Sequence, residues 1–102
     1  MDLAKAFDKM YKGLKDLKSQ LDNNSFNGDI ETTLVQFAQF ARREIIERMN
    51  KYNWDTSSNV VCLNIRVGKI TIAKALDENL FSLYFLARKY KCEPKIKKVL
   101  FE

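Results

Sequence analysis

Histidine is absent from this sequence, and proline, glycine and cysteine are rare, with one, three and two residues respectively. The absence of histidine excludes catalytic triads and zinc sites that depend on imidazole, and it excludes histidine-based pH switches. Two cysteines cannot supply a four-cysteine zinc site, and three glycines are too few for a phosphate-cradling loop. The sequence therefore favours functions that need little specialised side-chain chemistry.

Long hydrophobic runs are also missing. No stretch approaches the ~20 apolar residues of a membrane span, and the first residues lack the basic and then apolar order of a signal peptide. We therefore expect a cytoplasmic protein. Of the 102 residues, 46% are hydrophobic and 30% are charged, which predicts one globular domain over residues 1–102.

Catalytic arrangements are hard to find. Glu44 and Glu47 share a helix face, but their surroundings indicate solvated helix charges. Cys62 and Cys92 are interpreted as buried or half-buried free thiols, with a redox pair as the alternative. Cations close to Cys92 in the sequence would lower the pKa of its thiol. With no imidazole to activate a thiol, the chain is not expected to be an enzyme or to bind a cofactor or metal.

Two long helices are predicted first. One apolar stripe at helical spacing covers residues 2–22 and consists of Leu3, Phe7, Met10, Leu14, Leu17 and Leu21. Gly13 interrupts this helix and indicates close approach by a neighbouring element. A second stripe predicts a helix over 29–51 with Asp29 as its N-cap. The first stripe also fits a coiled-coil seam, but its flanking positions carry little charge, which favours an antiparallel hairpin within one chain.

The hydrophobic period changes to two between residues 59 and 74. Gly68 and Lys69 suit a two-residue type II′ turn, so we predict a β-hairpin of strands 59–67 and 70–74. This register pairs Val67 with Ile70 and Ile65 with Ile72.

A third helix is predicted over 77–91, with Asp77 as its N-cap. Pro94 ends it, and residues 94–101 fit either a short helix or an added strand, with the helix favoured. The predicted fold class is α+β. A long antiparallel helical hairpin packs on a two-stranded β-hairpin, followed by a buried third helix and a short C-terminal element.

Residues 80–87 are apolar nearly all round, which is typical of a helix that is buried on most sides or that hides one face in another chain. The predicted protein interface consists of Leu80, Phe81, Leu83, Tyr84 and Trp54. We therefore expect a small non-enzymatic binding or regulatory protein whose partner is a host protein or a second copy, as a homodimer. Its composition, rich in asparagine, lysine and isoleucine, is typical of accessory proteins of phages, viruses or plasmids.

The alternative prediction is nucleic-acid binding. The net charge is +5, and most of the excess lies in the second half of the chain. The residues predicted to contact phosphates are Arg66, Lys69, Arg88, Lys89, Lys91, Lys95, Lys97 and Lys98. The preference for lysine over arginine counts against specific recognition, because arginine is the usual partner of phosphates and bases.

Overall fold

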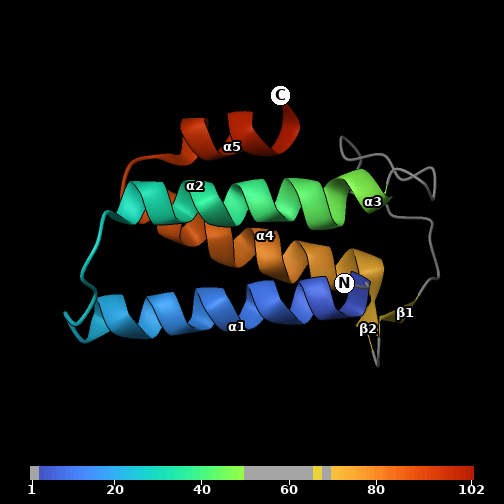
Figure 1. Cartoon of the computed structure of the whole chain (residues 1–102), viewed down its shortest axis with the longest axis horizontal. Coiled ribbons are helices and arrows are strands. Elements are labelled where there is room, and N and C mark those ends of the chain that lie inside the picture. Colours follow the sequence, from blue (N-terminus) through green and yellow to red (C-terminus); the bar gives the residue numbers. More distant parts are fainter. Residues whose placement is uncertain (1–2, 50–65, 68–69) are drawn as a thin grey trace.

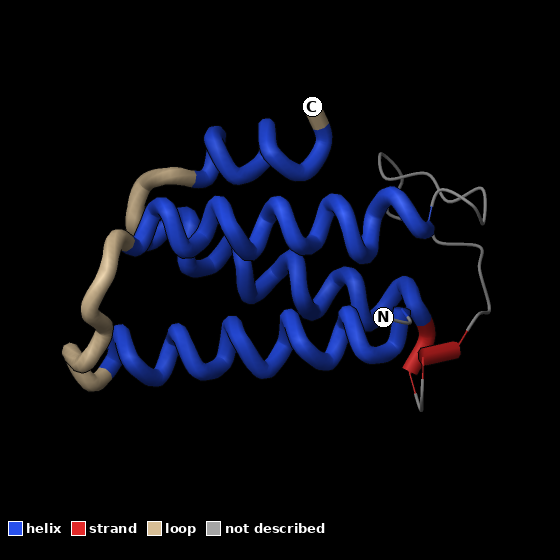
Figure 2. The backbone as a smooth tube through the Cα atoms, in the orientation of Figure 1, coloured by secondary structure: helices blue, strands red, loops and turns tan. Residues whose placement is uncertain are grey.

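The computed structural model describes residues 3–49, 66–67 and 70–102 (Figure 1). Its elements are helix α1 (Leu3–Asp22), α2 (Ile30–Ala41), the π-helical turn η1 (Arg42–Ile46), α3 (Glu47–Met49), strands β1 (Arg66–Val67) and β2 (Ile70–Thr71), α4 (Ile72–Lys89) and α5 (Glu93–Phe101). Figure 2 shows that α2, η1 and α3 form one continuous rod.

The long helices alternate in direction along the chain. Helix α1 runs antiparallel to α2, α4 runs in the direction of α1, and α5 returns in the direction of α2 (Figure 1). Helix α1 contacts α2 and α4, and α5 contacts the same two helices from the other side. The α2–α4 pair therefore lies between α1 and α5.

The core is formed where these helices meet. Its buried apolar residues are Ala6, Phe7, Met10, Leu14, Leu17, Leu34, Ala38, Ala41, Ile45, Ile46, Leu83, Leu86, Ala87, Cys92, Ile96 and Leu100. The predicted stripe of the first helix is confirmed, with Leu3 and Leu21 half-buried at its ends. The close approach expected at Gly13 is also present, because a Cβ atom there would lie 2.7 Å from Cε1 of Phe37.

Both helical hairpins turn through a residue with positive φ. Asn24 (φ 55°) follows α1, and Lys91 (φ 62°) follows α4. After α4, the backbone N–H of Cys92 donates to the carbonyl of Ala87 at 2.8 Å, the 6→1 bond of a Schellman motif. Asp29 caps α2 as predicted, accepting a hydrogen bond from the backbone N–H of Thr32 at 3.1 Å.

The predicted α+β fold class is wrong, because the architecture is helical. Strands β1 and β2 have two residues each and form no sheet layer. Val67 pairs with Ile70 as expected, but Ile72, predicted to continue the second strand, begins α4. The sequence after Thr71 contains Ala73, Ala75 and Leu76, which have high helix propensity, and this outweighs the short β alternation. Residues 59–65 of the predicted first strand lie outside the described residues.

The helix boundaries bring further corrections. Asp77 is not an N-cap, because α4 begins at Ile72. The C-terminal element is a helix, with Pro94 in its first turn where a missing N–H costs nothing. Among the described helices, none combines the length and apolarity needed to cross a bilayer.

Candidate functional site

Three aromatic side chains lie exposed where α1 and α4 meet. The exposed fractions are 72% for Phe81, 49% for Phe85 and 49% for Tyr11. Phe81 and Phe85 are one helical turn apart and therefore share a face of α4. We call Tyr11, Phe81 and Phe85 the aromatic surface. Its residues surround a hollow of about 260 Å³.

The floor of this hollow is apolar, because Leu14 and Leu86 contribute to its lining and belong to the core. The other lining residues are Lys15, Lys18 and Ser82. A second depression lies beside it along α4, lined by Phe81, Tyr84, Phe85, Arg88 and Lys89. The two hollows share Phe81 and Phe85, so these two rings border both of them.

Cations border the aromatic surface, and no carboxylate lines either hollow. The basic rim consists of Lys15, Lys18 and Lys89, and Arg88, which also lines the second hollow, pairs with Glu93. The Nζ atom of Lys18 lies 5.5 Å from the centroid of the Phe85 ring, within the range of a cation–π contact. Within the described part of the chain, no ion pair includes Lys15, Lys18 or Lys89.

The residues predicted for a protein interface separate in the structure. Phe81 is exposed and Leu83 is fully buried in the core. Leu80 and Tyr84 are half-buried, and burial raises the pKa of the Tyr84 phenol, with the nearby Glu93 charge adding to the effect. Trp54 lies outside the described residues. The apolar run of residues 80–87 does not itself indicate that Phe85 is exposed, although its spacing from Phe81 places both on one face. Tyr11 lies outside this run, and nothing in the sequence indicated its exposure.

Carboxylates engage much of the C-terminal basic run. Nε of Arg88 lies 2.8 Å from Oε2 of Glu93, and Nζ of Lys97 lies 3.0 Å from Oε1 of the same residue. Nζ of Lys95 lies 3.3 Å from Oε1 of Glu31 on α2. The hydrogen bonds from Arg88 and then Lys97 lower the pKa of the Glu93 carboxyl.

The other predicted phosphate contacts have no carboxylate partner among the described ion pairs or lie outside the described side chains. Lys89, Lys91 and Lys98 are exposed, and Nζ of Lys89 lies 5.8 Å from the centroid of the Tyr90 ring. Arg66 is described only as a backbone position of β1. Lys69 lies outside the described residues. Of the six predicted residues whose side chains the structure describes, three pair with carboxylates and three are exposed.

The thiol of Cys92 is not activated by its neighbours, contrary to the expectation from the sequence. It is free and buried, with 5% of the residue exposed. Burial raises the pKa of the thiol, and the negative charge of Glu31 raises it further, while Lys95 opposes both effects. Cys62 lies outside the described residues.

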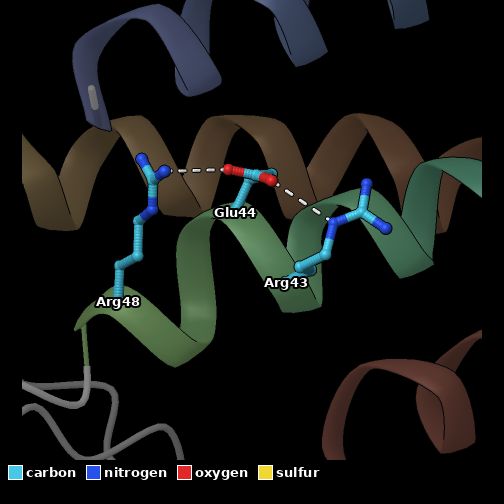
Figure 3. Close-up of polar contacts among 3 residues, drawn as sticks. All are labelled: Arg43, Glu44 and Arg48. Atoms are coloured by element: carbon cyan, nitrogen blue, oxygen red, sulfur yellow. Dashed lines mark hydrogen bonds and ion pairs between the residues drawn. The ribbon is translucent and has the colours of Figure 1, made fainter. Parts of the chain in front are cut away.

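The carboxylates of η1 and α3 also have arginine partners. Oε2 of Glu44 lies 3.0 Å from Nη2 of Arg48, and its Oε1 lies 3.3 Å from Nε of Arg43 (Figure 3). Glu47 pairs with Nε of Arg42 at 3.7 Å. Arg42 also donates from Nη1 to the carbonyl of Val99 at 3.1 Å, which ties this segment to α5. These carboxylates are therefore ion-pair partners on the helix surface.

No group of three potential metal ligands occurs among the residues that the structure describes. Comparisons with protein-family models, curated proteins and solved structures found no match. The chemistry of the aromatic surface and its basic rim is therefore the basis for a functional assignment.

Proposed function

We propose that this chain is a small non-enzymatic binding protein that docks a partner protein on the aromatic surface. The observation that carries the proposal is the exposure of Tyr11, Phe81 and Phe85 around one apolar hollow. Large aromatic side chains supply much of the binding free energy at protein interfaces when a partner covers them. A contiguous exposed patch of this kind is typical of an interaction site.

A different protein fits this surface better than a second copy. In a twofold symmetric contact, the same surface of each copy would face the other. Lys15, Lys18 and Lys89 of both copies would then lie in one interface, with no carboxylate in the hollows to balance their charge. Like charges placed opposite one another oppose association.

Nucleic acid is a weaker candidate, because Arg88, Lys95 and Lys97 already have carboxylate partners. Phosphate contacts by these residues would have to compete with Glu93 and Glu31. A partner that binds the aromatic surface, in contrast, would not have to break an ion pair of Lys15, Lys18 or Lys89.

The test places a photo-crosslinking amino acid at position 81 of the full chain, expressed in its source cells. A matched chain carries the crosslinker at position 101, because Phe101 is also an exposed phenylalanine (43%) but lies on α5. We expect a protein adduct from position 81 alone. The protein, identified by mass spectrometry and purified, should bind the unmodified chain.

Substitution then tests the surface itself. The double variant Phe81→Ala, Phe85→Ala should weaken binding of that purified partner by at least about 30-fold, as removal of hot-spot residues does. Phe101→Ala should leave binding unchanged. Equal adducts from both positions, an adduct only with a second copy, or an adduct only with nucleic acid would contradict the proposal.

A further inference from the structure

We infer that the partner segment that fits the aromatic surface is an acidic amphipathic α-helix lying along the groove between α1 and α4. This inference rests on the proposed function and specifies the chemistry of the partner. Its two parts, the helical conformation and the acidic charge, follow from different observations.

The walls of the groove favour a helix as the occupant. Both walls are α-helices, so their backbone N–H and C=O groups already pair within each helix. An extended peptide would find no strand edge here and would gain no main-chain hydrogen bonds. A helix satisfies its own backbone and presents apolar anchors at each turn, which matches the one-turn spacing of Phe81 and Phe85.

The rim determines the charge of the occupant. Lys15 and Lys18 line the α1 side of the first hollow, whose lining contains no carboxylate, and Lys89 lines the second hollow on α4. Arg88 also lines the second hollow but pairs with Glu93, so the charge argument rests on the lysines. Because Lys18 lies over the Phe85 ring, an apolar side chain that meets this ring brings its neighbours close to the ammonium group. Glutamate or aspartate at those neighbouring positions would complement the rim, which supports specificity and fast association.

The experiment uses designed helical peptides as probes, because the natural partner is unidentified. Two labelled peptides of about 20 residues share the same apolar face, and their flanks carry glutamate in one and lysine in the other. A third peptide keeps the glutamates but contains a central proline that prevents the helix. Fluorescence anisotropy measures binding of each peptide to the full chain.

We expect the acidic helical peptide to bind at least about tenfold more tightly than either of the others. Phe81→Ala with Phe85→Ala should weaken this binding at least about tenfold. The charge reversal Lys15→Glu with Lys18→Glu should weaken binding of the acidic peptide and strengthen binding of the lysine peptide. Phe101→Ala and Lys98→Glu are matched controls on α5 and should change neither affinity.

Several results would overturn the inference. If the acidic and lysine peptides bind with equal affinity, the partner need not be acidic. If the proline peptide binds as tightly as the acidic helical peptide, the partner need not be a helix. Displacement of the acidic peptide by a second copy of the chain, by a thymidine oligonucleotide or by phosphatidylserine vesicles, dependent on Phe81 and Phe85, would assign the surface to that ligand. If peptide binding fails while the crosslinked protein partner depends on Phe81, the proposed function stands and only the acidic helix is excluded.

Discussion

Helix α4 contacts α1 on one side and α5 on the other, and both contacts combine apolar side chains with cations. On the α5 side, Ile96 and Leu100 are buried, and Glu93 pairs with both Arg88 and Lys97. On the α1 side, Phe81 and Phe85 are exposed, and the lining of their hollows contains no carboxylate. The same residue types therefore form a completed contact on one side and an uncovered surface on the other.

The difference shows why local charge density in the sequence is a poor guide to a binding surface. The C-terminal run is the most basic part of the chain, yet Glu93 and Glu31 engage several of its cations. Lys15 and Lys18 attract little attention in the sequence, because Asp16 lies between them and α1 has no run of cations there. In the structure they border the exposed aromatic rings, which places them where a bound partner would contact them.

The largest expected effect is on the free energy of unfolding. It distinguishes the buried apolar residues between α4 and α5 from the exposed ones of the aromatic surface. Ile96→Ala should lower the free energy of unfolding by about 2–5 kcal/mol, because it leaves a cavity in a fully buried site. Phe81→Ala should change it by less than about 0.5 kcal/mol. Urea denaturation followed by circular dichroism measures both. A large loss for Phe81→Ala would mean that the aromatic surface belongs to the core.

Thiol reactivity gives the second comparison. Cys92 should react with iodoacetamide at pH 7 at least about tenfold more slowly in the folded chain than in urea, because burial protects it and raises its pKa. A cysteine introduced by Phe81→Cys should react at similar rates in both states. Peptide mass mapping assigns each rate to its residue. Fast alkylation of native Cys92 would show that the α4–α5 turn is open.

A substitution in the turn between α4 and α5 should increase the stability of the chain. Lys91→Gly should raise the free energy of unfolding by about 1 kcal/mol, because Lys91 holds a positive φ that glycine adopts without strain. Lys91→Ala removes the same charge but keeps the Cβ atom, so it should not stabilise the chain. Thermal unfolding of the two variants distinguishes conformational strain from charge.

The smallest effect concerns the ion pairs of Glu93. The pKa of its carboxyl lies below the ordinary value of 4.5, chiefly because of the hydrogen bond from Arg88. A lowered pKa means that these pairs stabilise the fold above pH 4.5, and that the stabilisation is lost as the pH falls through the lower value of the folded state. Glu93→Gln should remove this part of the pH dependence. Stability curves measured between neutral and acidic pH test it, and identical curves for both proteins would contradict the assignment.

Much of the helical organisation could be predicted from the sequence. The stripe from Leu3 to Leu21 and the capping side chain of Asp29 are local signals, and both were confirmed. The sequence also anticipated the approach of Phe37 to Gly13, although it did not identify the partner. The β-hairpin prediction failed because a short alternating segment fits two structures, and strands of two residues are too short to form a layer.

The candidate site could be predicted only in part. Residues 80–87 stood out as too apolar for an ordinary surface helix, and Phe81 lies on the exposed face as an interface requires. Leu83 did not belong with it, because a residue two positions further along a helix points to a different side. Tyr11 could not be linked to α4 from the sequence, since the contact joins elements about 70 residues apart.

The sequence by itself determined the first two helices and the N-cap Asp29, because these depend on residues within a few positions of one another. It also excluded imidazole chemistry through its composition, and it favoured, without deciding, a C-terminal helix. Only the tertiary structure decided the helical fold class, the aromatic residues left exposed and the cations already paired. The reason is that packing and ion pairing join residues far apart in the chain. Lys95 finds Glu31 and Tyr11 lies beside Phe81 and Phe85 only after the helices have assembled.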